Sequence, residues 1–404
     1  MGGLMNILQI LPYPIVNPIH GGQLRAKAIN DLLSESEHSI ISCSIYDKYN
    51  GYIAGKYDIA FNEVITEYDW DHPKVLDFVI GEVVKESQTI ENYLVNLIDS
   101  FKIDAIILEQ PWFFKLLFKI SKYRNIKLIY SSHNIEYRLK FSMLDEEEKE
   151  NLAYLNYIDA VESLEASLVA YCDLIICCTE KDKKFYDQEL DKLGLNTDVI
   201  VAGNAVEPFD IDCNRVNYWK NYIKKPYAVF VGSAHEPNSN GFWTMMSPGL
   251  TFLAPDEEIV VVGGVCDILL RNELEKEFDE LNKTRVHMMG QRSKLDLQSM
   301  VLASHVVLLP ICEGEGSNLK TAEALESGRP IVATSKAFRG YEEAMSLAHI
   351  YIEDTPEGFR ERVRTILNNK RYEEGTDVSV RSKYYWTNQL SGILPAIKNL
   401  ENIS

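Results

Sequence analysis

Two glycines and a lysine surround one predicted helix start in the second half of the sequence. A strand predicted over Val306–Pro310 is followed by a loop with Gly314 and Gly316, and a helix is expected to begin near Ser317–Asn318. The first N–H groups of a helix lack partners inside it, and the helix dipole adds partial positive charge there. Glycine lets the backbone approach a ligand closely, and Lys320 adds a full charge. This segment predicts a diphosphate site; the alternative is an ordinary strand–helix turn.

Two glutamates eight residues apart belong to the same segment. Glu315 lies in the loop, and Glu323 lies about two turns into the predicted helix, so both can line one cleft. Carboxylates accept hydrogen bonds from hydroxyl groups. We therefore predict that Glu323 binds a ribose and Glu315 binds hydroxyls of a transferred sugar; the alternative is that both are solvated.

A second glycine pair follows the first predicted strand. Gly21 and Gly22 precede a helix at the end of that strand, where doubly wound sheets bind ligands, and Arg25 can reach a phosphate or sugar from the first turns. The pattern is not the dinucleotide fingerprint, because no G-x-G-x-x-G follows a strand. A purely structural turn remains the alternative.

A histidine follows the strand predicted over Lys127–Ser131. At that end of an α/β sheet, His133 is well placed to hydrogen-bond a ligand. The alternative is a structural histidine.

Short apolar β runs alternate with amphipathic helical segments along the chain, which predicts α/β layers with parallel, doubly wound sheets. Periodicity is lost near Ala202–Lys225, so we expect a domain boundary there. Predicted helices include Leu24–Leu33, Lys85–Phe101 and Glu146–Cys172. The predicted strands are Asn6–Leu11, Ser39–Cys43, Ala105–Leu108, Lys127–Ser131, Leu174–Cys178, Ala228–Gly232, Glu258–Gly263, Val286–Met289, Val306–Pro310 and Ile331–Thr334.

Length and charge restrict the class of protein. A chain of 404 residues predicts two domains, and its formal net charge of −19 argues against nucleic acid as a partner. The seven cysteines show no paired metal-ligand spacing, so no metal site is expected. No apolar run approaches the roughly 18 residues that cross a bilayer, and the N-terminus lacks a signal-peptide pattern. We therefore expect a cytoplasmic protein.

Together these segments resemble the retaining glycosyltransferases of family four (glycosyl transferases group 1), which have the GT-B architecture. The resemblance covers nearly the whole chain and rests on the first glycine loop, the His133–Glu136 segment, Asn204-Ala-Val-Glu and the Glu315/Glu323 pair in its Gly-Ser-Asn-Leu-Lys-Thr-Ala-Glu-Ala-Leu setting. It implies two Rossmann-like doubly wound domains facing a central cleft. Their expected bounds are 1–205 for the acceptor domain, 206–378 for the nucleotide-sugar domain, and 379–404 for a C-terminal helix that crosses back to the first domain.

The resemblance also implies roles for residues. Glu323 would hold the ribose, Glu315 would touch the donor sugar, and His133 would lie near the hydroxymethyl group of that sugar. Gly22 would lie near the phosphates. The amides of Ser317, Asn318 and Leu319 would hold the pyrophosphate, and the backbone at Gln291 and Arg292 would face the base. The implied donor is a nucleotide sugar with uridine as the default base and guanosine as the alternative, and no metal or other cofactor is needed. The acceptor would be a glycan or a lipid-linked glycan in bacterial surface-polysaccharide synthesis.

One departure from the family concerns charge. Many members carry an Arg and a Lys after the first strand of the second domain, whereas the segment Gly232–Gly241 has neither. We expect Lys320 to neutralise the diphosphate instead, with Arg292 as a weaker candidate.

A basic and aromatic stretch at 111–132 suggests peripheral contact with the inner face of the cell membrane, because Lys115, Lys119 and Lys122 share one helical face. The alternative is an amphipathic helix packed on the sheet. Two rival functions remain open, a nucleotide-sugar epimerase of the same architecture and a catalytically silent nucleotide-sugar-binding subunit.

Overall fold

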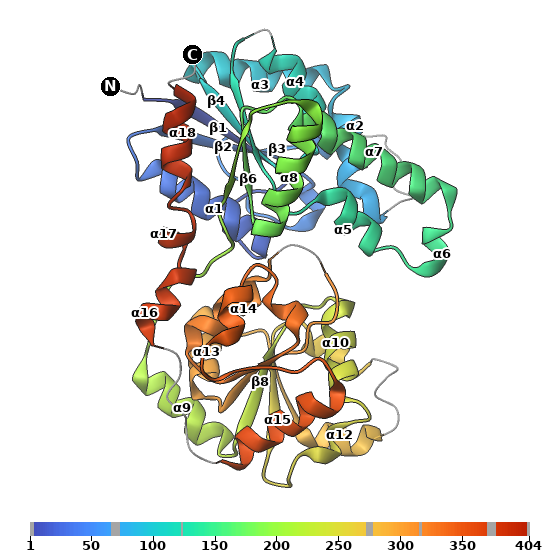
Figure 1. Ribbon diagram of the computed structural model, residues 1–404, viewed down its shortest axis with the longest axis vertical. Coiled ribbons are helices and arrows are strands. Elements are labelled where there is room, and N and C mark those ends of the chain that lie inside the picture. The colour runs from blue at the N-terminus through green and yellow to red at the C-terminus, as the bar shows by residue number, and fades with distance from the viewer. Residues whose placement is uncertain are drawn as a thin grey trace. The chain divides into compact units, whose positions relative to one another are not determined.

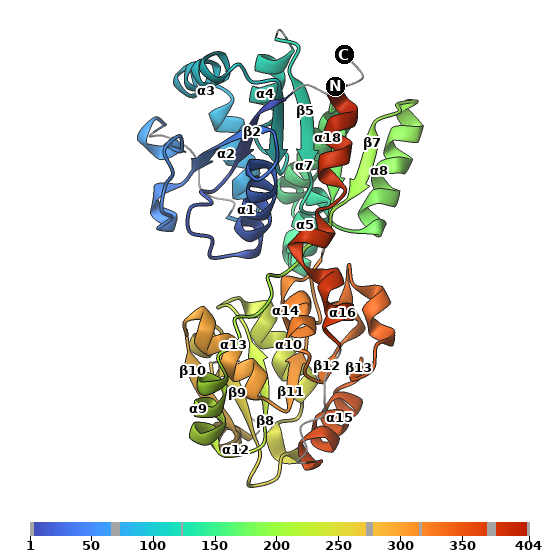
Figure 2. The same cartoon turned by 90° about the vertical axis from the view of Figure 1, so that its left-hand side faces the viewer.

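The computed structural model describes residues 4–65, 73–122, 124–271, 278–314, 317–369 and 377–401. The chain forms two compact units. The first contains Met1–Gly203 and Gln389–Ser404, and the second contains Asn204–Asn388 (Figures 1 and 2).

The first unit is built on a parallel sheet that has seven strands among the described residues, in the order β3-β2-β1-β4-β5-β6-β7. Its strands are β1 (Asn6–Leu11), β2 (Ser39–Tyr46), β3 (Ile59–Ala60), β4 (Ala105–Glu109), β5 (Lys127–Ser131), β6 (Leu174–Cys177) and β7 (Asp198–Val201). Its helices are α1 (Gly21–Ser34), α2 (Leu76–Val84), α3 (Gln88–Phe101), α4 (Phe114–Ser121), α5 (Glu136–Ser142), α6 (Glu146–Lys149), α7 (Leu152–Val169), α8 (Glu180–Leu193) and α18 (Ile393–Glu401). All residues of β4 and β6 are buried, as expected where helices cover both faces of a parallel sheet.

The second unit has a parallel sheet with the order β10-β9-β8-β11-β12-β13 among the described residues. Its strands are β8 (Tyr227–Val231), β9 (Glu258–Val262), β10 (Val286–Gly290), β11 (Val306–Leu309), β12 (Ile331–Ala333) and β13 (Ile350–Ile352). Its helices are α9 (Cys213–Ile223), α10 (Glu236–Met246), α11 (Cys266–Leu269), α12 (Asp279–Arg285), α13 (Lys294–Ala303), α14 (Leu319–Ser327), α15 (Pro356–Asn368) and α16 (Val378–Arg381), and α17 (Trp386–Gln389) lies where the chain passes from the second unit to the first.

Both strand orders follow the doubly wound pattern, in which the direction of winding reverses between two adjacent strands. The reversal lies between β1 and β4 in the first unit and between β8 and β11 in the second. The prediction of an α/β fold with two Rossmann-like domains is thus confirmed. Ligands of such sheets bind beyond the carboxyl ends of the strands at this reversal.

Two predicted helices are shorter in the structure. The helix predicted over Glu146–Cys172 is divided into α6 and α7, because Asn151 caps α7 by accepting a hydrogen bond from the backbone N–H of Ala153 at 2.9 Å. The helix predicted over Lys85–Phe101 begins only at Gln88, where Ser87 is the N-cap. The predicted ranges were wrong because capping residues inside an amphipathic pattern were not recognised.

The two chain segments that connect the units pair with each other inside the second unit. Val206 forms a parallel bridge with Tyr385, and its backbone N–H donates to the carbonyl of Tyr384 at 3.0 Å. The aromatic run that begins at Tyr384 therefore fixes the start of the second unit.

The close approach of α10 to the end of β11 depends on a glycine. A Cβ on Gly241 would lie 2.2 Å from the carbonyl oxygen of Pro310. Gly241→Ala is therefore expected to lower the free energy of unfolding by about 1–3 kcal/mol, because backbone must move to accept the methyl group.

Calorimetric unfolding measures this effect. Gly392→Ala is the matched control, because a Cβ there meets no atom within 4 Å, and it should leave the unfolding temperature unchanged or slightly raised. Equal unfolding temperatures for both variants would contradict the packing described for α10.

Candidate functional site

The loop after β11 leads into α14 much as the sequence indicates. Asn318 is the N-cap, and its side chain accepts a hydrogen bond from the N–H of Lys320 at 3.2 Å. The backbone N–H groups of Ser317, Asn318 and Leu319 donate to no other described part of the chain. Gly314 has a positive φ of 107°, a conformation that favours glycine. Glu315 and Gly316 lie outside the described residues, so the structure does not place them.

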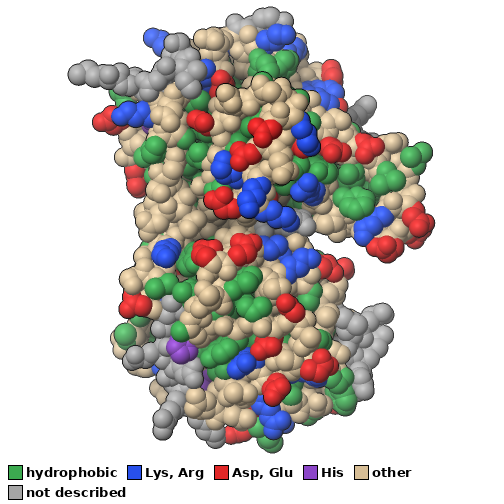
Figure 3. Space-filling view, viewed as in Figure 1, with side chains coloured by type: hydrophobic (Ala, Val, Ile, Leu, Met, Phe, Trp, Pro, Cys, Tyr) green, Lys and Arg blue, Asp and Glu red, His purple; other side chains and the backbone are tan. Residues whose placement is uncertain are grey.

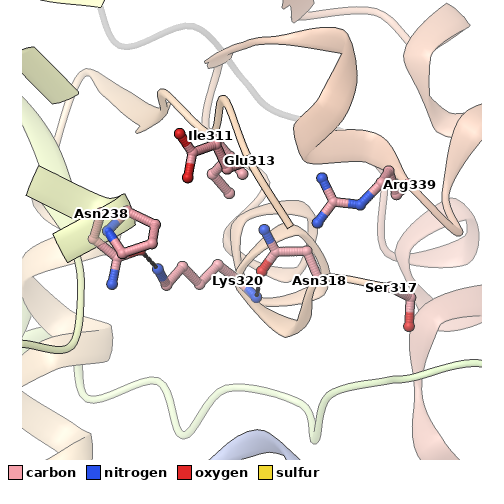
Figure 4. Close-up of a pocket in the computed structure, with 8 residues that line it drawn as sticks. Asn238, Ile311, Glu313, Ser317, Asn318, Lys320 and Arg339 are labelled. Atoms are coloured by element: carbon pink, nitrogen blue, oxygen red, sulfur yellow. Dashed lines mark hydrogen bonds between the residues drawn. The ribbon is translucent and has the colours of Figure 1, made fainter. Parts of the chain in front are cut away.

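A pocket of about 210 Å³ opens at this helix start (Figure 4). It lies at the carboxyl ends of β8, β11 and β12, beside the reversal of the sheet. Its volume is below the roughly 300–1,000 Å³ of complete small-molecule sites, so it fits one polar part of a larger ligand. The lining residues are Pro237, Asn238, Ile311, Glu313, Ser317, Asn318, Lys320 and Arg339.

Lys320 supplies one positive charge to the pocket. Its ammonium donates to the side-chain oxygen of Asn238, in the first turn of α10 (Figure 4). Asn238 is held in turn by a hydrogen bond from its amide nitrogen to the carbonyl of Ser233 at 2.9 Å. Burial lowers the pKa of Lys320 to about 8, although the charge of Glu323 acts in the opposite direction. An anion bound in the pocket would favour the charged form.

Arg339 supplies a second positive charge that the sequence analysis missed. It follows the 3₁₀ turn Ser335–Phe338 after β12, and its Nη1 donates to the carbonyl of Lys336 at 2.8 Å. The sequence could have indicated Arg339 by its position, because it follows the strand that pairs with β11. Parallel strands have their carboxyl ends at one edge of the sheet, so the loops after them lie close together.

Glu323 lies in the second turn of α14 and is half-buried. Burial raises its pKa, while the charges of Lys320 and Lys294 act in the opposite direction. No described residue donates a hydrogen bond to its carboxylate. Glu323 does not line the pocket itself, so it would contact a neighbouring part of a ligand.

Gln291 and Arg292 are not brought to the pocket. Both are exposed after β10, which is an edge strand of the sheet. The guanidinium of Arg292 donates to the carbonyl of Gln291 at 3.1 Å. Arg292 is therefore not the second cation of the pocket, and Arg339 takes that place.

In the first unit, His133 forms part of a buried polar chain. Its Nε2 lies 2.7 Å from Oε2 of Glu109 at the end of β4, and Gln9 donates to the other carboxylate oxygen at 2.7 Å. Burial raises the pKa of Glu109, but the hydrogen bonds that its carboxylate makes with His133 and Gln9 bring the pKa below its ordinary value. An ionised Glu109 accepts the proton of Nε2, so Nδ1 faces the hydroxyl of Tyr13 at 3.3 Å.

Sequence reasoning did not single out Glu109. Its signal was its position directly after the apolar run Ala105–Leu108, at the same edge of the sheet as His133.

Gly21 and Gly22 open α1 next to this chain of polar groups. A Cβ on Gly22 would lie 2.3 Å from the hydroxyl oxygen of Tyr13 and 3.5 Å from Nδ1 of His133. The missing side chain accommodates Tyr13 in this structure. The fold thus brings Gly22 and His133 together at the reversal between β1 and β4.

The prediction that Arg25 reaches a ligand is corrected. Its side chain is only 1% exposed, and its Nη1 donates to the carbonyl of Ala202 at 2.6 Å. Arg25 therefore ties α1 to the segment after β7, because a buried charge must be paired within the protein.

The basic and aromatic stretch at 111–132 packs on the first unit. Lys115 pairs with Glu82 at 2.7 Å, and Lys119 pairs with Glu91 at 2.6 Å. Its aromatic side chains Trp112, Phe113 and Phe114 are buried. The alternative of an amphipathic helix packed on the sheet accounts for these contacts. Figure 3 shows acidic and basic side chains close to one another on the face that it presents.

The described residues contain no group of three or more His, Cys, Asp or Glu side chains that could hold a metal ion. No helix in the same part of the chain has the length and apolar character needed to cross a membrane.

Comparisons with known proteins agree with this architecture. Residues 225–369, most of the second unit, match the family Glycosyl transferases group 1. Among curated protein sequences, none matches this chain.

Solved structures with a similar fold cover nearly the whole chain. Sucrose-phosphate synthase from Thermosynechococcus elongatus has a TM-score of 0.64 at 12% identity, over 99% of this chain and 100% of that one. HepE from Anabaena in complex with UDP-glucose has a TM-score of 0.63 at 13% identity, over 98% and 100%. A putative UDP-N-acetylglucosamine 2-epimerase from Listeria monocytogenes has a TM-score of 0.57 at 12% identity, over 100% and 98%. At these identities the likeness shows the fold. Residues 225–369 of the second unit thus match the glycosyl transferases group 1 family, and the chain has the GT-B fold of glycosyltransferase structures.

Proposed function

We propose that this protein is a glycosyltransferase that moves a sugar from a nucleoside-diphosphate sugar, with uridine as the base, to a glycan or lipid-linked acceptor. The observation that carries the proposal is the open start of α14. The N–H groups of Ser317, Asn318 and Leu319 donate to no other described residue, and Lys320 and Arg339 line the pocket there. Helix starts with added cations bind phosphates, and the surrounding domain matches a glycosyltransferase family.

The dimensions of the pocket support a diphosphate as the group held there. A volume of about 210 Å³ is too small for a whole nucleotide sugar. Glu323, one turn further along α14, has a carboxylate that can accept hydrogen bonds from ribose hydroxyls. The similar fold of HepE, whose structure contains UDP-glucose, supports a uridine nucleotide.

The proposed reaction retains the configuration of the sugar and uses no metal. The bond between the anomeric carbon and the phosphate oxygen breaks, and the acceptor hydroxyl bonds to the anomeric carbon on the same face. The acceptor proton passes to the leaving diphosphate. Amide groups and two cations stabilise the charge that develops on that diphosphate, and this electrostatic effect is commonly the largest in such catalysis. Glu315, which the structure does not describe, is proposed to contact the sugar.

The first unit is proposed to bind the acceptor and to place His133 against the sugar. The hydrogen bond between His133 and Glu109 supports this role, because it fixes which ring nitrogen carries the proton. Gly22 adjoins His133 at the start of α1. We infer a cytoplasmic enzyme of polysaccharide or glycoconjugate synthesis, working at the inner face of a membrane where lipid-linked acceptors lie.

The His133–Glu109 pair also gives an observation in favour of an epimerase, which needs acid and base groups near the sugar. A putative epimerase from Listeria monocytogenes shares the fold. Conversion of the donor sugar into its epimer without any acceptor would favour that alternative. Donor binding without transfer, hydrolysis or epimerisation would favour a silent binding subunit.

Substitutions in α14 separate donor binding from transfer. Glu323→Gln is expected to weaken binding of the nucleotide sugar about tenfold, because a carboxylate accepts stronger hydrogen bonds than a neutral amide does. Lys320→Ala is expected to weaken donor binding as well and, in addition, to lower kcat, because it removes charge beside the diphosphate both when it is bound and when it leaves. Thermal shift with a panel of nucleotide sugars identifies the donor, and calorimetry with transfer kinetics measures both effects. The control is Glu280→Gln, because Glu280 is exposed, with a side chain that is 94% accessible. Donor affinity and kcat equal to those of the wild type in both α14 variants would overturn the assignment of the donor site to α14.

The affinity for the donor is expected to fall as the pH rises. Burial sets the pKa of Lys320 at about 8, so this lysine is charged at pH 7 and mostly neutral at pH 9. Loss of its charge should weaken binding by up to about tenfold over this range. Titration calorimetry at several pH values measures the change. A flat profile for the wild type would contradict contact between Lys320 and the diphosphate.

Glu109→Gln tests the role of the buried pair in the first unit. The amide cannot fix the imidazole as the carboxylate does, so kcat should fall about tenfold or more while the affinity for the donor's nucleotide stays unchanged. The pH profile of kcat should also shift, which loss of stability alone would not cause. A normal kcat in a folded Glu109→Gln variant would remove His133 from the proposed mechanism.

A further inference from the structure

The positive charges of the pocket come from two separate elements. Lys320 belongs to the first turn of α14, and Arg339 follows the 3₁₀ turn after β12. Figure 4 shows Lys320 extending toward Asn238 and Arg339 lying on the other side of Asn318. The two cations therefore flank the helix start from opposite sides. Glu313 is the one acidic side chain among the described lining residues, and it is exposed.

The guanidinium of Arg339 has a defined place. Its Nη1 donates to the carbonyl of Lys336 at 2.8 Å. Gly314 lies against its other nitrogen, because a Cβ on Gly314 would be 3.0 Å from Nη2. The glycine therefore leaves space for the guanidinium beside the loop that precedes α14.

An arginine in this place differs chemically from the lysine opposite. An arginine guanidinium is not deprotonated in proteins, and its planar fork can donate two hydrogen bonds to one phosphate group. An ammonium acts as a single point of charge. Two cations on either side of the helix start match a ligand with two linked phosphate groups better than a ligand with one.

We propose that Arg339 binds the diphosphate of the nucleotide and makes the site selective for nucleoside diphosphates over monophosphates. This inference rests on the proposed function and names a residue that the sequence did not indicate. Lys320 and the helix start hold one phosphate group, and Arg339 holds the other. Gly314 serves the site by leaving room for this guanidinium.

Titration calorimetry with UDP, UMP and uridine tests the proposal in the full chain, and GDP, GMP and guanosine form the second series. Arg339→Gln is expected to weaken diphosphate binding about tenfold or more, and monophosphate binding much less. Nucleoside binding should stay as in the wild type. The matched control is Arg364→Gln on α15, an exposed arginine outside the pocket, which should change none of these affinities. Thermal unfolding confirms that both variants are folded.

The outcomes for the variant and for the wild type test different claims, namely the role of Arg339 and the proposed function. Unchanged diphosphate affinity in Arg339→Gln, or an equal loss for all three ligands, overturns the role of Arg339 while the proposed function stands. A wild-type protein that binds neither diphosphate overturns the proposed function itself.

A double-mutant cycle tests the link between Gly314 and Arg339. Gly314→Ala should weaken diphosphate binding in the wild type, because the methyl group displaces the guanidinium. In the Arg339→Gln background the same substitution should have a much smaller effect, since backbone strain at residue 314 is common to both backgrounds. Equal effects in both backgrounds would show that Gly314 does not act through Arg339 and would overturn that part of the proposal.

Discussion

An acidic chain that binds an anion must concentrate positive potential in one place. The net charge of −19 opposes any phosphate at long range. At the start of α14, backbone amides, the helix dipole, Lys320 and Arg339 act together within one small pocket. Neighbouring contacts support that helix start. Asn204 donates to the carbonyl of Ser317 at 3.4 Å, and the hydroxyl of Tyr341 donates to the carbonyl of Asn204 at 2.8 Å.

In both units the candidate functional residues lie where the winding of the sheet reverses, but the side chains at that place differ in chemistry. In each sheet the winding reverses between two central strands, and the loops at their carboxyl ends diverge. In the second unit this edge carries two cations and amides that have no partner among the described residues. In the first unit the same edge carries His133, whose ring is fixed by Glu109. One unit is thus suited to charge stabilisation and the other to a directed hydrogen bond.

Burial separates residues that serve stability from residues that can meet a ligand. Arg25 and Lys320 both lie in the first turns of helices that follow glycine loops. Arg25 is sealed inside its unit and bonded to the carbonyl of Ala202, whereas Lys320 lines an open pocket. Sequence spacing gives both residues the same description, because it does not reveal which helix face the rest of the chain covers.

The sequence by itself determined the alternating α/β pattern, the central strands and the helix start at Asn318, because buried parallel strands are continuous apolar runs and capping is local. It missed three edge strands, β3, β7 and β13, since an edge strand is short and only partly buried. Only the tertiary structure decided that Arg339 lines the pocket and that Glu109 bonds to His133. Residues from different loops become neighbours through strand order, and strand order depends on how the whole chain packs rather than on any local pattern.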